Sequence, residues 1–370
     1  MVERDTRAAW AVEGSAGRST IAAEEVDAAS RAHWEATADE YQVEHGAFLA
    51  ERHRVVETDR PSNQTDSSVA GPRTGEGFVW GPEGLTEAVA GLLGPVEDLV
   101  RRRVLEVGCG AAQCSQWLAA RGVSAIGIDI SVPQLRHAAS LVTSAAPTSP
   151  AGSRRVSADR VRSDPTGSAL GPSEPDAIRS APQGRAPGPA SEAGRPVGAS
   201  AAVGAGRGRL HVRAATATAL PFPDDTFDAA FASYGAIQFV GDLPRLLGEV
   251  RRVLRPGGRW VFSVTHPIRW AFPDDPGPAG LSVSGSYFDR TPYVERDASG
   301  AAVYAEFHRT IGDYVSALLG AGFVLDSIVE PEWPDWNDAT WGGWSPQRGT
   351  HLPGTLIFGC RADAGLTPPD

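Results

Sequence analysis

The sequence predicts an α/β fold, in which a mainly parallel sheet carries helices on both faces. Three observations support this class. Short apolar runs typical of buried strands alternate with helix-like segments from residue 103 to residue 360. One run ends at Gly108-Cys109-Gly110, a turn that leads into a helix, and a strongly amphipathic helix precedes a later strand. Such sheets bind ligands beyond the carboxyl ends of their strands, so the residues after each strand form the candidate site.

The first predicted element is a helix near the N-terminus. One of its faces carries apolar and aromatic side chains: Trp34, Ala38, Tyr41, His45, Phe48 and Leu49. We expect residues 1–50 to form a helical segment that packs against the domain and covers the ligand site.

Two segments have the composition of disordered inserts. Residues 51–77 are polar and rich in turn-forming residues, and residues 142–208 are dense in Ala, Gly, Pro, Ser and Arg with no aromatic residue. We expect the long insert to interrupt one domain, residues 78–362, and residues 363–370 to form a tail. The arginines of the long insert could bind anions weakly, but a solvated linker is the favoured interpretation.

The first half of the domain contains two strand and helix pairs. Strands are predicted at Arg103–Val107 and Ala125–Ile130. Helices are predicted at Gln113–Ala120, ended by Arg121-Gly122, and at Pro133–Leu141, with proline in the first turn.

The second half continues the alternation. Its clearest helix has apolar residues at Leu243, Leu246, Leu247, Val250 and Leu254, with Asp242 as a cap and Pro256-Gly257-Gly258 as its end. The other predicted elements are strands at 210–213, 227–233, 259–265, 323–329 and 355–360 and a helix at 311–321.

Composition narrows the class of partner. The net charge of -11 argues against nucleic acid or an anionic membrane as the main partner, and favours a small-molecule substrate. The three cysteines, Cys109, Cys114 and Cys360, fit neither a disulfide framework nor a four-ligand zinc site, so we expect a reducing, cytoplasmic location and no metal. The N-terminus has no signal-peptide pattern, and no segment is apolar enough to span a membrane. Oligomeric state is left open.

The glycine-rich turn after the first strand is the strongest local signal. Small residues allow a ligand to approach the backbone closely, and the helix N-terminus that follows favours an anionic group. A dinucleotide-binding turn would have a third glycine where this chain has Gln113, which weakens a nicotinamide interpretation. A purely structural turn is the alternative.

Asp129 ends the second strand, about 20 residues after the glycines, where a carboxylate can accept hydrogen bonds from both hydroxyls of a ribose. This favours a nucleoside ligand without separating adenosylmethionine from NAD. The alternative is that Asp129 caps the helix starting at Pro133.

Four motifs occur in order: Glu106-Val107-Gly108-Cys109-Gly110, Gly127-Ile128-Asp129-Ile130-Ser131, Leu220-Pro221-Phe222 with Phe227-Asp228, and Arg252-Val253-Leu254-Arg255-Pro256-Gly257-Gly258. Together they resemble the class I S-adenosylmethionine-dependent methyltransferases, in particular the methyltransferase type 11 group and its uncharacterised actinobacterial members. The resemblance covers roughly Val104 to Val264 apart from the insert. It implies a Rossmann-like, mainly parallel seven-stranded sheet, S-adenosyl-L-methionine as cofactor and S-adenosyl-L-homocysteine as product.

The resemblance also implies positions for the cofactor. Its methionine end would contact Glu106, Gly108, Cys109 and Gly110, its ribose Asp129 and its adenine Ile130, with Gln134 and Tyr41 as further contacts. Ser233 and Tyr234, after the fourth strand, would lie near the transferable methyl group. The family usually has Asp where this chain has Thr216. The adenine contact would then fall to Thr216 and the backbone of Ala217.

Methyl transfer needs little acid–base chemistry, because positioning the reactants and excluding water supply much of the rate. Where the acceptor must lose a proton, His266, directly after the fifth strand, is the first candidate base, with Tyr234 beside the methyl group. A structural histidine that caps the strand is the alternative. His308 and His45 are weaker candidates.

We expect the acceptor pocket to come from Pro267–Glu306 and the tryptophan-rich segment after it. Its candidate residues are Trp34, His45, His308, Trp333 and Trp336, of which the last two lie close in sequence to Trp341, Trp344 and several carboxylates. Simple packing of a lid is the alternative. Two rival functions stay open: a non-catalytic adenosylmethionine-binding protein, and an NAD(P)-dependent reductase that would bind NADH.

Overall fold

The computed structural model describes residues 14–51, 77–144, 200–202 and 208–365. All of these belong to one compact unit. The expected inserts at 51–77 and 142–208 lie almost wholly outside the described residues, as does most of the expected tail at 363–370.

The described part of the chain forms an eight-stranded sheet with the order β10-β11-β7-β6-β2-β3-β5-β4. The central pairs β5–β3, β3–β2, β2–β6 and β6–β7 are parallel, whereas β11, β10 and β4 pair antiparallel at the two ends. The strands are β2 (Arg103–Val107), β3 (Ser124–Asp129), β4 (Ser200–Ala202), β5 (Arg209–Ala214), β6 (Phe227–Ala232), β7 (Leu254–Thr265), β10 (Phe323–Val329) and β11 (Thr355–Ala362). The predicted fold class is confirmed, and β4 adds a short edge strand to the expected seven.

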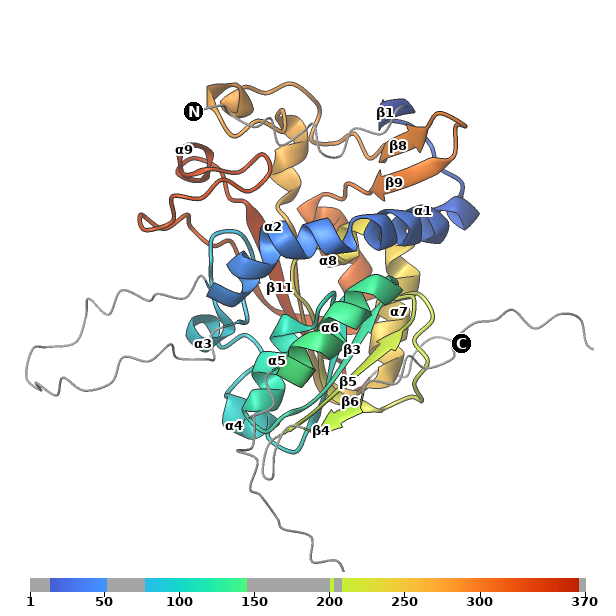
Figure 1. The fold of residues 1–370 in the computed structure, drawn as a ribbon, viewed down its shortest axis with the longest axis vertical. Coiled ribbons are helices and arrows are strands. Elements are labelled where there is room, and N and C mark those ends of the chain that lie inside the picture. The colour runs from blue at the N-terminus through green and yellow to red at the C-terminus, as the bar shows by residue number, and fades with distance from the viewer. Residues whose placement is uncertain (1–13, 52–76, 145–199, 203–207, 366–370) are drawn as a thin grey trace, which may run out of the picture. The chain divides into compact units, whose positions relative to one another are not determined.

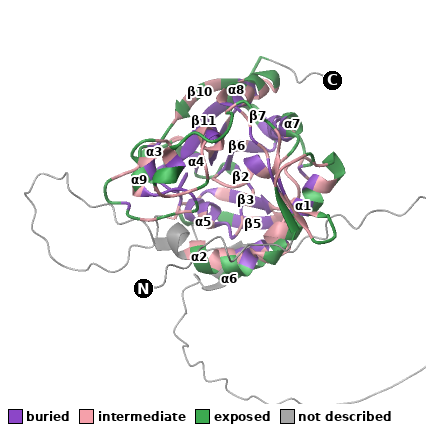
Figure 2. Ribbon diagram, turned by 90° about the horizontal axis from the view of Figure 1, so that it is seen from above, coloured by how far each residue is buried: buried purple, intermediate pink, exposed green. Residues whose placement is uncertain are grey.

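Helices pack on both faces of this sheet, because successive residues of its strands enter two different cores. Leu105 faces the core that contains the apolar side of α7, and Val104 faces the core that contains Trp117 of α5. Figure 2 shows the buried residues concentrated on the strands between these helical layers. The helices and turns are α3 (Glu87–Ala90), α4 (Val96–Leu99), α5 (Gln113–Ala120), α6 (Val132–Ser144), η1 (Ile237–Phe239), α7 (Leu243–Val253), η2 (Pro267–Ala271), η3 (Pro278–Leu281), α8 (Ile311–Gly320) and α9 (Pro346–Gly349).

The amphipathic helix ends slightly earlier than expected, before Leu254. Helix α7 ends at Val253, and Leu254 already has extended backbone and pairs with Phe227. Strand β7 therefore includes Pro256-Gly257-Gly258, which was expected to separate helix from strand. The ladder to β6 is irregular here and becomes regular from Arg259 onward.

The N-terminal segment differs from the single helix expected. It contains a strand, β1 (Gly14–Arg18), followed by two helices, α1 (Ala23–Ala36) and α2 (Ala38–Glu51), which meet at Thr37. Strand β1 forms a second sheet with β8 (Tyr293–Asp297) and β9 (Ala302–Glu306), and α1 packs against β9. Figure 1 shows α1 and α2 running one after the other between this small sheet and α6.

No helix of the described segments is long and apolar enough to cross a membrane.

Candidate functional site

Two adjoining pockets lie at the carboxyl ends of β2, β3, β5 and β6, where the strand order reverses. The empty space of the first is about 590 Å³ and that of the second about 800 Å³, with the solvent at their open mouths included. Four residues line both: Tyr41, Gly108, Gly110 and Tyr234. Every residue that the sequence analysis places on the cofactor side lines at least one of them: Tyr41, Glu106, Gly108, Cys109, Gly110, Asp129, Ile130, Gln134, Thr216, Ala217 and Ser233.

The turn after β2 requires glycine for two reasons. Gly108 and Gly110 have φ angles of +69° and +50°, a region that strongly favours glycine. A β-carbon at Gly108 would also lie 2.4 Å from the β-carbon of Ala236. The turn is therefore structurally constrained, and it also lines both pockets.

Among the described residues that line the first pocket, Glu106 is the only charged one. It is 3% exposed, and its Oε2 accepts a hydrogen bond of 3.0 Å from the backbone N–H of Ser115 in the first turn of α5. Burial raises the pKa of Glu106 to about 8, because little water is present to stabilise its charged form. If a cationic group of a ligand bound here, the carboxyl group of Glu106 would lose its proton and pair with it.

Asp129 lies at the end of β3, and its two carboxylate oxygens accept 2.8 Å hydrogen bonds from the backbone N–H groups of Gly110 and Ser131. These bonds stabilise the charged form, but burial dominates and raises the pKa of Asp129 above its ordinary value. The alternative role of helix cap falls to Ser131, whose hydroxyl accepts a hydrogen bond from the N–H of Gln134. Asp129 thus points into the second pocket and is held by the glycine turn.

The second pocket continues past Asp129 to Ile130, Thr216 and Ala217. The hydroxyl of Thr216 donates a 3.1 Å hydrogen bond to Asp27 of α1, which also lines this pocket. Local sequence patterns gave no signal for Asp27, because it comes from a helix distant in sequence.

The helices α1 and α2 cover both pockets. Gln42 of α2 accepts a hydrogen bond from Gln113 of α5 and donates one to Gln134 of α6, at 3.1 and 2.9 Å. Trp34 packs edge-on against Tyr41 and lines the second pocket. The expected covering role of this segment is therefore consistent with its contacts.

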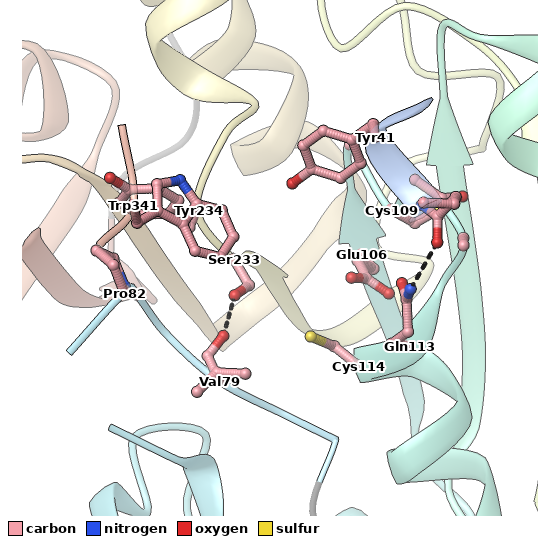
Figure 3. A pocket seen from close by; sticks show the side chains of 15 residues that line it. Tyr41, Val79, Pro82, Glu106, Cys109, Gln113, Cys114, Ser233, Tyr234 and Trp341 are labelled. Atoms are coloured by element: carbon pink, nitrogen blue, oxygen red, sulfur yellow. Dashed lines mark hydrogen bonds between the residues drawn. The ribbon is translucent and has the colours of Figure 1, made fainter. Parts of the chain in front are cut away.

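The residues after β6 form the opposite wall of the first pocket. Tyr234 has a φ of +38°, and its N–H donates a 2.8 Å hydrogen bond to the hydroxyl of Ser263 on β7. The hydroxyl of Ser233 donates to the carbonyl of Val79. Figure 3 shows Tyr234, Trp341 and Pro82 gathered on one side of this pocket, with Glu106 and Gln113 on the other.

The three candidate histidines do not line either pocket. His266 is buried, accepts a hydrogen bond at Nδ1 from the N–H of Ile268, and has Nε2 2.8 Å from Oε1 of Glu330. These contacts favour the capping interpretation for His266. His308 contacts the carbonyl of Tyr287 through Nε2, and is likewise engaged in packing.

His45 does not line the first pocket but contacts a residue that does. Its ring stacks on that of Trp341 at 4.3 Å between centroids and 12° between planes. Trp341 itself lines the first pocket and is the tryptophan that the sequence analysis left out of the site.

Of the three tryptophans that were expected in the acceptor pocket, Trp34 lines the second pocket, whereas Trp333 and Trp336 line neither pocket. Trp333 donates to the carbonyl of Asn337 and packs on Gly349, and Trp336 is 49% exposed beside Gly84. The packing interpretation fits both. The pocket residues not foreseen from sequence are Asp27, Ser30, Gln42, Val79, Gly81, Pro82, Val107, Ala111, Gln113, Cys114, Ile128, Ala215, Gly235, Ala236, Phe239, Val240 and Trp341.

Among the described residues, no group of three or more His, Cys, Asp or Glu side chains has a metal-binding arrangement.

Residues 193–262 match a family model described as a methyltransferase domain. A demethylmenaquinone methyltransferase of Streptomyces avermitilis is 48% identical over 63 residues, which is 17% of this chain and 26% of the relative. One of Thermus thermophilus is 41% identical over 87 residues, 23% of this chain and 36% of the relative. These matches thus span about a third of each relative or less.

Solved structures with a similar fold include two described as S-adenosylmethionine-dependent methyltransferases. The Mesorhizobium loti protein has a TM-score of 0.45 at 22% identity, covering 76% of this chain and all of that one. The Listeria monocytogenes protein, a putative member, has a TM-score of 0.47 at 18% identity, covering 72% of this chain and 92% of that one.

Proposed function

We propose that this chain, which belongs to the class I methyltransferases by its matched domain and its sheet topology, binds S-adenosyl-L-methionine and transfers its methyl group to a small acceptor. The observation that carries the proposal is the pair of joined pockets. Residues selected from sequence for an adenosylmethionine site line them at the carboxyl ends of the parallel strands.

The side chains of the pockets suit this cofactor. Asp129 offers carboxylate oxygens at the end of β3, where a ribose with two hydroxyls would hydrogen bond, and Ile130 and Ala217 offer apolar contact to an adenine ring. The turn at Gly108 and Gly110 allows a chain of atoms to pass close to the backbone. Glu106, buried beyond that turn, would pair with the ammonium of the methionine end.

When bound, S-adenosyl-L-methionine supplies a methyl group on a positively charged sulfur. The protein's own contribution would be to align the acceptor and to exclude water. Trp34 of α1 and Tyr41 of α2 line the pockets and would serve this role. Burial raises the pKa of Tyr41 to about 12 and that of Tyr234 further, so both phenols stay protonated at neutral pH. They would orient an acceptor and would not remove its proton.

We propose that the acceptor is a flat molecule without a negative charge. The wall of the first pocket away from Glu106 includes Tyr234, Trp341 and Pro82, and none of the described residues that line this pocket is basic. An anionic acceptor would therefore have no cationic partner, whereas an aromatic ring would find aromatic faces. The Streptomyces avermitilis and Thermus thermophilus relatives are named for demethylmenaquinone, which is compatible with this wall.

Calorimetric titration with S-adenosyl-L-methionine and S-adenosyl-L-homocysteine tests the cofactor. We expect saturable one-to-one binding that Asp129→Ala weakens, and no binding of NADH. Well-folded protein that binds NADH and neither adenosyl ligand would refute the proposal. Release of S-adenosyl-L-homocysteine with a panel of phenols and quinols then tests turnover, and cofactor binding without turnover on any acceptor would point to a non-catalytic binding protein.

A further inference from the structure

The second pocket contains two charged residues, and they come from opposite sides of it. Asp129 belongs to the sheet and Asp27 to helix α1, and no basic residue of the described segments lines this pocket. Asp129 is held by the glycine turn through the N–H of Gly110. If the ribose of the cofactor lies on Asp129, the base extends toward Ile130, Thr216 and Ala217, where Asp27 is found.

Hydrogen bonds from neighbouring residues of helix α1 fix the position of Asp27. Helix α1 is attached on one side of the pocket by Arg31, which donates a 2.9 Å hydrogen bond to the carbonyl of Ile130. On the other side, the hydroxyl of Ser30 donates to the carbonyl of Phe239 at 3.3 Å. Residues 27, 30 and 34 lie on one face of α1, and all three line the pocket.

The carboxylate of Asp27 is also oriented. Its Oδ2 accepts a 3.1 Å hydrogen bond from the hydroxyl of Thr216, which is in turn 3.0 Å from the hydroxyl of Thr218. Among the described residues, Oδ1 has no hydrogen-bond partner. Asp27 is an exposed residue that lines this pocket, and its carboxylate oxygen can accept a hydrogen bond from an N–H donor and repels an acceptor.

We propose that Asp27 recognises the exocyclic amino group of the adenine, so that helix α1 supplies the residue that selects adenine over a 6-oxopurine. This inference rests on the proposed function and assigns one further contact within it. Adenine carries an N–H donor at this position and hypoxanthine a carbonyl acceptor, so the carboxylate favours the first and opposes the second.

The test compares S-adenosyl-L-homocysteine with S-inosyl-L-homocysteine, in which a carbonyl replaces that amino group and ring N1 carries a hydrogen, by calorimetry on the full chain. We expect the native protein to prefer the adenosyl ligand by about 10-fold or more. Asp27→Ala should weaken binding of the adenosyl ligand by about 10-fold and remove most of the preference for it over the inosyl ligand. Glu24→Ala is the matched control, because it removes the same charge from an exposed residue of α1 that lines neither pocket.

A rescue variant separates recognition from a structural effect. Because Thr216 is hydrogen bonded to Asp27, the double variant Asp27→Ala/Thr216→Asp places a carboxylate beside the lost one and should restore the preference for the adenosyl ligand. The proposal would be overturned if Asp27→Ala weakened the binding of both ligands equally, or if that variant kept the native selectivity. Failure of the native protein to bind S-adenosyl-L-homocysteine would instead refute the proposed function itself.

Discussion

Cofactor binding should release a proton from Glu106. The carboxyl group of Glu106 has a pKa of about 8 in the free protein because it is buried, so it is mostly protonated at pH 7. Pairing with the ammonium of S-adenosyl-L-homocysteine requires the ionised form. From that pKa, about one Glu106 in eleven is ionised at pH 7, so binding should release about 0.9 proton.

The affinity should follow the ionised fraction. That fraction rises from about 0.03 at pH 6.5 to about 0.76 at pH 8.5, which predicts binding about 25-fold tighter at the higher pH, or about 2 kcal/mol. Calorimetry in buffers of different ionisation enthalpy measures both the protons released and the affinity. The Glu106→Gln variant keeps a hydrogen-bond acceptor for the N–H of Ser115. It should release fewer protons on binding, because only the contribution of Asp129 to the proton release remains. An identical proton count and pH dependence in native protein and variant would refute the assignment of Glu106.

Three further outcomes follow from the site. His266→Ala should lower the free energy of unfolding by about 1 to 3 kcal/mol in urea titrations, and a shifted pH profile of methyl transfer in this variant would contradict its placement outside the pockets. Gly108→Ala should lower the free energy of unfolding by about 2 kcal/mol or more because its β-carbon meets Ala236, whereas Gly110→Ala, whose β-carbon would make only an ordinary contact of 3.8 Å with Oε1 of Gln134, should lower it by about 1 kcal/mol; equal losses on thermal unfolding would refute this steric account. Cys114, whose thiol pKa is raised by burial, should react slowly with iodoacetamide, faster as pH rises, and more slowly still with S-adenosyl-L-homocysteine bound, as peptide mass spectrometry can measure; acceleration by the ligand would contradict its place in the first pocket.

The parts of the site that the sequence predicts well are those coded by a strand and the residues after it. Gly108, Gly110 and Asp129 follow β2 and β3 directly, and the carboxyl ends of parallel strands meet at one edge of the sheet. Their positions can be predicted from the local sequence pattern and from the parallel pairing of the strands, and the sequence indicates both.

The parts that the sequence could not place depend on contacts between distant segments. Asp27 reaches the second pocket from helix α1 and lies in no local pattern that marks a binding residue. Trp341 belongs to the tryptophan-rich segment that was expected to form the acceptor pocket, but the sequence did not distinguish it from its neighbours. His266 does follow a strand, but its backbone N–H bonds to Gly354 beside the antiparallel neighbour β11, and its ring contacts Glu330. An antiparallel neighbour at that edge was not visible in the local sequence.

The most direct test of the account is a crystal structure of the full chain with S-adenosyl-L-homocysteine. The account predicts the ribose hydroxyls within hydrogen-bond distance of Asp129, the adenine between Ile130 and Ala217, and the ammonium at Glu106. A nucleoside bound outside the two pockets, or one whose ribose lies away from Asp129, would contradict it.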